Sequence, residues 1–148
     1  MARDGYTAAP MQLIVSFVFS AAHRLPDYMG RCVRMHGHDY RLEVVVEGVP
    51  DGRTGMVVDF HEVQGAAGPL VASVDHRCFN DLLANPTAEA IVVYLWRRLR
   101  PALPALTELR LWETADCHIV YRGEPVPDAL LAPGVPGDHP STAPPESA

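Results

Sequence analysis

Residues 32–46 read Cys-Val-Arg-Met-His-Gly-His-Asp-Tyr-Arg-Leu-Glu-Val-Val-Val, and this stretch decides the fold. From His36 onward its residues alternate with a period of two. His36, His38 and Tyr40 begin a face that continues with Leu42 and valines, whereas the other face is mostly charged. Such alternation is typical of an antiparallel strand with one buried face. The two histidines therefore open this strand together and point into the protein.

A third histidine, His23, ends the preceding apolar segment, residues 12–23. It has the same parity as an alternating apolar series: Leu13, Val15, Phe17, Phe19 and Ala21. If the two segments pair as a hairpin, His23 lies beside His36 and His38. The connection between them, residues 24–35, has a length that is usually functional or mobile in a compact domain.

Three neutral imidazoles can hold a divalent metal. Zinc bound by His23, His36 and His38 would keep one coordination position open, as catalytic zinc does. The alternative is that each histidine is a hydrogen-bonded core residue, which is the simpler explanation for any one of them. Because strand parity makes all three converge, the pattern favours a zinc site.

Two helices are predicted after these strands. The spacing of Asp59 and Glu62 is typical of a capping box, so the first helix begins there. Its interior contains three residues that should kink or interrupt it: Gly65, Gly68 and Pro69. The second helix carries an apolar stripe, is capped by either Asn85 or Thr87, and ends before Pro101.

Two further strands are expected, at residues 107–113 and 117–122. The order ββααββ predicts an α+β fold, with a four-stranded antiparallel sheet and both helices on one face. We expect a leader at residues 1–10 and one domain at residues 11–123. Seven of the chain's fourteen prolines lie in residues 124–148, which we expect to form a disordered tail.

Composition limits the classes of function. A chain of 148 residues is long enough for one domain with a core, and a formal net charge of −6 argues against a nucleic-acid partner. No segment is long and apolar enough to predict a membrane span. Residues 11–22 imitate a signal peptide, but no net positive charge precedes them. We therefore expect a cytoplasmic protein, whose three cysteines are reduced.

Other candidate site residues lie near the histidines or between the helices. Cys32 is four residues before His36, and two arginines, Arg31 and Arg34, flank it and favour its thiolate. It could be a reactive thiolate, be a fourth zinc ligand, or have no role. The dipeptide Asp75-His76 offers a proton carrier with an orienting carboxylate, although such a pair in a loop is often simply polar.

Glu113 breaks the apolar pattern of the strand face that carries Leu109 and Leu111. A carboxylate at an inward position is costly unless it is paired. It suits a ligand with adjacent N–H donors, such as the amino-pyrimidinone edge of a pterin or guanine. A buried ion pair with an arginine is the competing explanation.

Five short motifs occur in a characteristic order within residues 11–123. They are Phe-Val-Phe-Ser-Ala-Ala-His-Arg-Leu at 17–25, Cys-x-x-x-His-Gly-His at 32–38, Asp-His at 75–76, Asn-Pro-Thr-Ala-Glu at 85–89 and Trp-Glu-Thr at 112–114. As a set, they resemble the 6-pyruvoyltetrahydropterin synthase and 6-carboxytetrahydropterin synthase family.

This resemblance implies the tunnelling fold, in which subunits join their sheets into a barrel and form homo-oligomers, commonly hexamers built as dimers of trimers. It implies zinc on the three histidines. Cys32 would abstract a proton, with Asp75 and His76 as its partners, and Glu113 would anchor the pterin. Active sites of the family lie between subunits, so Asp75 and His76 would serve a neighbour's Cys32.

The three residues between Cys32 and His36 resemble the bacterial carboxy-forming branch. The implied reaction converts 7,8-dihydroneopterin triphosphate to 6-carboxytetrahydropterin, acetaldehyde and triphosphate, on the route to queuosine or other 7-deazapurines. The alternatives are the pyruvoyl-forming synthase, a non-catalytic pterin-binding protein and a scaffold whose zinc is structural.

Overall fold

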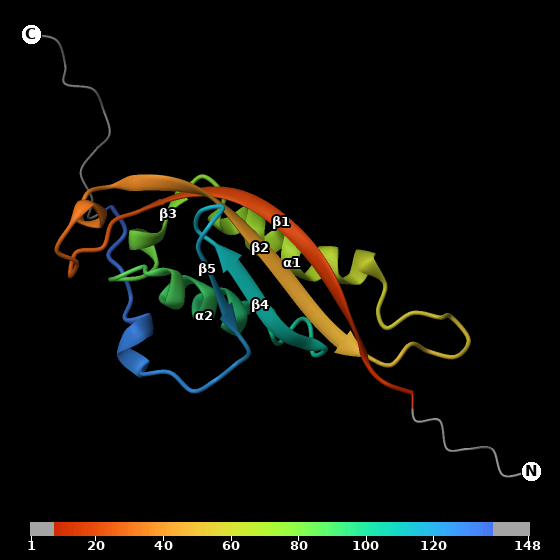
Figure 1. Ribbon diagram of the computed structural model, residues 1–148. Helices are drawn as coiled ribbons and strands as arrows, with labels where there is room; N and C mark the ends of the chain where they lie inside the picture. Colours follow the sequence, from red (N-terminus) through yellow and green to blue (C-terminus); the bar gives the residue numbers. More distant parts are fainter. Residues whose placement is uncertain (1–7, 138–148) are drawn as a thin grey trace, which may run out of the picture.

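The computed structural model describes residues 8–137 and contains one mixed sheet with two helices packed on one face (Figure 1). The order of strands across the sheet is β3-β1-β2-β4-β5. The strands are β1 (Met11–His23), β2 (His36–Gly48), β3 (Arg77–Cys78), β4 (Leu106–Trp112) and β5 (His118–Tyr121). The helices are α1 (Phe60–Val74) and α2 (Ala88–Leu99), and three short 3-10 helices are η1 (Arg31–Val33), η2 (Phe79–Asp81) and η3 (Asp128–Leu131). The predicted α+β fold is confirmed.

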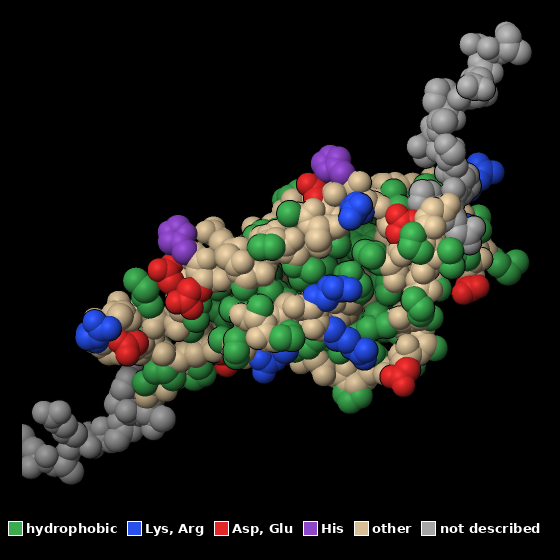
Figure 2. Space-filling view, turned by 180° about the vertical axis from the view of Figure 1, so that it is seen from behind, with side chains coloured by type: hydrophobic (Ala, Val, Ile, Leu, Met, Phe, Trp, Pro, Cys, Tyr) green, Lys and Arg blue, Asp and Glu red, His purple; other side chains and the backbone are tan. Residues whose placement is uncertain are grey.

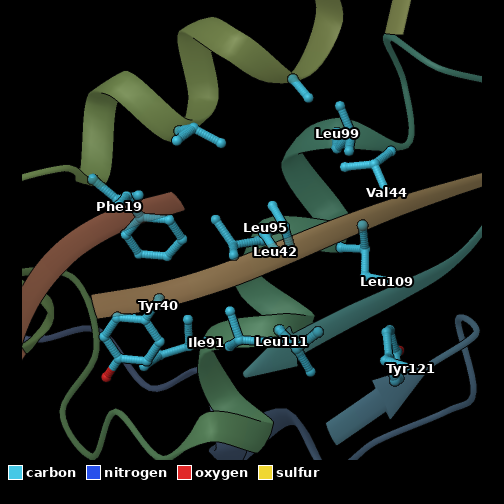
Figure 3. Packing of buried hydrophobic residues seen from close by; sticks show 14 of the residues in the cluster. Phe19, Tyr40, Leu42, Val44, Ile91, Leu95, Leu99, Leu109, Leu111 and Tyr121 are labelled. Carbon is cyan, nitrogen blue, oxygen red and sulfur yellow. The ribbon is translucent and has the colours of Figure 1, made fainter. Parts of the chain in front are cut away.

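The hairpin of β1 and β2 has the register that the alternation predicts. Phe19 is paired with Tyr40 and His23 with His36. Because paired residues point to the same face, the rings of Phe19 and Tyr40 stack with centroids 5.2 Å apart. Both residues are buried beneath the helices together with Ile91 and Leu111 (Figure 3). This register brings the end of β1 next to the beginning of β2.

Helix α1 begins as predicted but is not interrupted. The side chain of Asp59 accepts a hydrogen bond from His61 N, which is the expected cap. The helix then continues through Pro69 to Val74, so the predicted break was wrong. Its buried residues recur every three or four positions: Val63, Ala67, Val71 and Val74. Burial of this stripe against the sheet outweighs the backbone hydrogen bond that proline removes.

Helix α2 resolves the choice between two caps. The side chain of Thr87 accepts a hydrogen bond from Ala90 N, so Thr87 rather than Asn85 is the N-cap. No helix in residues 8–137 is long and apolar enough to cross a membrane.

The prediction of four strands was wrong by one. β3 adds a fifth strand, which pairs in parallel with β1 through Ala21 and Arg77. It is only two residues long, so its sequence contains no periodic pattern that could reveal it. It nevertheless holds the segment after α1 against the edge of β1.

Part of the predicted disordered tail is packed on the domain. Leu130 and Leu131 in η3 pack against the core, and Ala84 N donates a hydrogen bond of 2.9 Å to Ala132 O. Gly134 lies so close to Asn80 that a Cβ atom there would be 2.0 Å from the Asn80 carbonyl oxygen. Residues 124–137 therefore differ from the expectation, because Val126, Leu130 and Leu131 pack against the core. The predicted leader lies mostly, and the rest of the tail entirely, outside the described residues.

The second face of the sheet has no helix over it within residues 8–137. Trp112 lies on this face between His118, stacked at 4.2 Å, and the Arg41 guanidinium, 4.0 Å from the ring. Val18 is 69% exposed on the same face. Five charged residues form ion pairs on it: Arg41, Glu43, Glu108, Arg110 and Arg122. Figure 2 shows the molecule from behind the view of Figure 1, and there too hydrophobic side chains reach the surface between scattered charges.

Candidate metal centre and the cavity beside it

The structure brings together the three histidines that the sequence singles out. The ring of His23 lies 4.5 Å from that of His36 and 5.2 Å from that of His38, and the other two are 4.9 Å apart. Glu113, at the end of β4, joins them. One ligand atom from each of these four residues lies within 4.8 Å of all the others.

Backbone carbonyls orient two of the three rings. Pro86 O lies 2.8 Å from Nδ1 of His23, and Arg34 O lies 2.7 Å from Nδ1 of His36. A carbonyl oxygen only accepts hydrogen bonds, so each Nδ1 carries the proton and each neutral ring presents its Nε2 lone pair. This is the tautomer in which metal-binding histidines are commonly held.

Two of the Nε2 atoms are buried without a hydrogen-bonding partner in the described part of the chain, those of His23 and His38. Each lies 3.0 Å from Glu113 Oε1, but the contact lacks the direction of a hydrogen bond. A tetrahedral ion with bonds of about 2.1 Å holds its ligands about 3.4 Å apart. The donor types, with all four ligand atoms within 4.8 Å of one another, therefore suit a divalent metal such as zinc.

The electrostatics of the cluster suit a cation. Burial lowers the pKa of His38, although the negative charge of Glu113 partly offsets this effect. The close contact with His23 lowers the pKa of Glu113 and outweighs the opposing effect of burial. At neutral pH these shifts favour a neutral His38 ring beside an ionised Glu113 carboxylate.

Cys32 lies on the connection between the two histidine-bearing strands. It is partly buried in η1, and its carbonyl accepts a 2.7 Å hydrogen bond from Leu25 N. This bond joins Leu25, two positions after His23, to Cys32, four positions before His36. The thiol is therefore carried by a loop that both metal-candidate strands anchor.

Asp75 and His76 form a pair at the edge of β1. Asp75 Oδ1 accepts a hydrogen bond from Ser20 N at 2.9 Å and lies 3.0 Å from Nδ1 of His76. The bond from Ser20 is the main reason that the pKa of Asp75 is lowered. Neither residue is among the four whose ligand atoms gather in the candidate metal cluster. A 750 Å³ cavity has both His76 and His38 in its wall.

A second cavity, of 370 Å³, lies on the other side of Glu113. Its wall includes Leu25 and Tyr28 from the loop, Thr87 and Glu89 from the start of α2, and Glu113. No sequence pattern points to Tyr28, because it is an isolated aromatic residue in a loop. Glu113 thus lies between the histidines and a hollow that could receive a small molecule.

Comparison with known proteins assigns the chain to a family. The model of the 6-pyruvoyl tetrahydropterin synthase family matches residues 12–124. A 6-carboxy-5,6,7,8-tetrahydropterin synthase from Synechocystis is 39% identical over 113 residues, which cover 71% of this chain and 88% of that protein. A dihydroneopterin monophosphate aldolase from Pyrococcus furiosus is 36% identical over 105 residues, which cover 69% and 89%.

A solved structure shares the fold. The Caenorhabditis elegans 6-pyruvoyl tetrahydropterin synthase superposes with a TM-score of 0.74 at 24% identity, over 80% of this chain and 99% of that one. The match of the family model over residues 12–124 and the identity with the Synechocystis relative show that the chain belongs to the 6-pyruvoyl tetrahydropterin synthase family.

Proposed function

We propose that this protein is a zinc-dependent lyase. It converts 7,8-dihydroneopterin triphosphate and water to 6-carboxy-5,6,7,8-tetrahydropterin, acetaldehyde and triphosphate. The observation that carries the proposal is the cluster of three histidines beside Glu113, with two ring tautomers held ready for a metal. The name of the Synechocystis relative supports the carboxy product.

Zinc is the metal that best suits three imidazole ligands with an open position. When bound, it would supply a Lewis acid that polarises a substrate oxygen and acidifies the adjacent C–H bond. The ligands in this proposal are Nε2 atoms of His23, His36 and His38. The Pro86 and Arg34 carbonyls hold two of these rings in place, so little reorientation is needed on binding.

The remaining residues handle protons and the pterin ring. Cys32 removes and returns protons as a thiolate, and Glu113 accepts hydrogen bonds from the N–H groups of the ring. Asp75 holds His76 as a proton carrier, 3.0 Å away. Because this pair is not part of the histidine cluster of its own chain, we propose that it serves the Cys32 of a neighbouring subunit.

This role requires a homo-oligomer, and we propose a hexamer made of two trimers. The exposed side chains of Val18 and Ile14 on the helix-free face of the sheet support the assembly, because joined sheets would cover them. Light scattering of the purified protein measures the mass. A monomer at working concentration would remove the shared site.

We place the reaction in the cytoplasm, on the route to queuosine or another 7-deazapurine. The proposed chemistry needs a reduced thiol at Cys32, and all three cysteines are free in the structure. The reducing cytoplasm maintains thiols in this state.

Product analysis tests the reaction. The zinc-loaded protein is incubated with 7,8-dihydroneopterin triphosphate, and the products are identified by mass spectrometry, with acetaldehyde trapped as a hydrazone. Acetaldehyde and 6-carboxytetrahydropterin in equal amounts are expected. Release of triphosphate with a pyruvoyl product and no acetaldehyde would refute the carboxy assignment. Faster turnover of dihydroneopterin monophosphate, the compound in the name of the Pyrococcus relative, would refute the triphosphate as substrate.

The role of Cys32 needs a separate variant. Cys32→Ala should abolish turnover while zinc stays near one ion per chain, because the thiol is not among the proposed ligands. Val33→Ala changes an exposed neighbour in the same loop and should retain activity. An active Cys32→Ala variant would remove the thiol from the mechanism, and loss of zinc from it would favour a structural site with a thiolate ligand.

A further inference from the structure

The 370 Å³ cavity beside Glu113 has a distinctive chemistry. Its volume falls within the range of about 300–1,000 Å³ that is usual for small-molecule sites. Leu25 and Leu111 give it apolar walls, while Glu89 and Glu113 give it carboxylates. Carboxylates accept hydrogen bonds but do not donate them when ionised. The cavity therefore suits a flat ring whose faces meet apolar side chains and whose edge carries N–H donors.

Tyr28 lies in the cavity wall, on the loop that connects β1 and β2. Tyr28 N donates a 3.1 Å hydrogen bond to Leu25 O, and Leu25 N donates in turn to Cys32 O at 2.7 Å. These two bonds tie Tyr28 to the loop that carries the thiol. The side chain is nevertheless 54% exposed. Such a large aromatic surface loses contact with water when a planar molecule covers it.

Gly30 makes room for the ring of Tyr28. A Cβ atom at position 30 would lie 2.7 Å from Tyr28 Cε1 and 3.3 Å from Cδ1. The ring therefore passes across the face of the glycine, in a space that a side chain would occupy. The placement of Tyr28 depends on this residue as well as on the turn.

We propose that Tyr28 is a specificity residue, which stacks on the planar pterin ring while the carboxylates accept its N–H groups. This inference rests on the proposed function, because it takes the pterin as the ligand. It goes beyond that function because it assigns contact with the ring to a loop residue, Tyr28. It also links binding of the ring to the loop that carries Cys32.

Binding of neopterin, the oxidised form of the substrate without phosphates, measures ring recognition without turnover. Its fluorescence is titrated with the zinc-loaded, full-length protein. Replacing an aromatic residue that stacks on a base weakens binding by about 10- to 100-fold, so Tyr28→Ala should raise Kd by this factor. Tyr28→Phe keeps the ring and should stay within about twofold. Met29→Ala is the matched control, because the neighbouring Met29 is 98% exposed.

A double-mutant cycle separates stacking from general damage to the loop. Gly30→Ala should raise Kd for neopterin in the unaltered background, because the new methyl group displaces the ring. The same change should have no further effect in a Tyr28→Ala background. In turnover of the triphosphate substrate, Tyr28→Ala should raise KM with little change in kcat, as loss of uniform binding does.

The outcomes distinguish failure of the role of Tyr28 from failure of the proposed function. If the unaltered protein binds neopterin and Tyr28→Ala binds it equally well, Tyr28 does not contact the ring. Additive effects of Gly30→Ala and Tyr28→Ala would also overturn the proposal, since each would then act alone. If the unaltered protein does not bind neopterin, both the pterin as ligand and the role of Tyr28 are refuted. Melting temperature and zinc content confirm that each variant is folded and loaded.

Discussion

Removal of the metal should destabilise the protein by an amount that the unpaired nitrogens set. In the structure, Nε2 of His23 and Nε2 of His38 are both buried without a hydrogen-bonding partner in the described residues. A buried polar atom without a partner costs about 1–3 kcal/mol, so ligation of both should stabilise the fold by about 2–6 kcal/mol. For a chain of this size, each kcal/mol shifts the melting temperature by about 2–4 °C. We therefore expect the melting temperature to decrease by about 4–24 °C on removal of zinc.

The assay is thermal unfolding of the zinc-loaded protein and of protein dialysed against EDTA, followed by circular dichroism. His36→Ala should bind little zinc and should show no decrease on dialysis. His61→Ala is the matched control, because His61 is an exposed residue in the first turn of α1 and should behave like the unaltered protein. If His36→Ala retains one zinc per chain and the full decrease on dialysis, the three-histidine site is wrong.

Three further predictions concern stability. In metal-free protein, the lowered pKa of His38 means that the unfolded chain binds more protons than the folded chain below about pH 6.5. The free energy of unfolding, measured by urea titration, should therefore fall from pH 7 to pH 5.5, and it should fall less in His38→Gln. An equal fall in both proteins would refute this role of His38. Gly134→Ala should cost about 1–3 kcal/mol, because its methyl group overlaps the Asn80 carbonyl and displaces a hydrogen-bonded segment, whereas Gly52→Ala, with no neighbour within 4 Å, should cost far less in urea unfolding. Gly68→Ala lies in the helix interior with nothing within 4 Å of the added Cβ atom, so it should raise the free energy of unfolding by about 0.5–1 kcal/mol and with it the urea midpoint. A lower midpoint would contradict the assigned helix.

The parts of the fold that alternate in sequence could be predicted, and the parts that depend on tertiary contacts could not. The two-residue period of residues 36–46 places the first hairpin in its observed register, because a shift of one residue would expose Tyr40. Pro69 shows the limit of local propensity, since burial of one side of α1 overrides it. The two residues of β3 and the docking of residues 124–137 depend on surfaces made elsewhere in the chain.

The candidate site divides in the same way. Strand parity was sufficient to predict that His23, His36 and His38 would meet. The carbonyl groups that orient two of these rings belong to backbone, which every residue possesses, so no residue type reveals them. Tyr28 escaped notice for a related reason, because its place in the cavity wall depends on a turn and on the space that Gly30 leaves.

The hydrogen bond from His36 to the Arg34 carbonyl connects the metal-facing ring to the residue that follows the short helix containing Cys32. One short stretch of backbone therefore positions both the imidazole and the thiol. A substitution that displaces the Arg34 peptide should disturb zinc binding and the reactivity of Cys32 together, although position 34 supplies neither group.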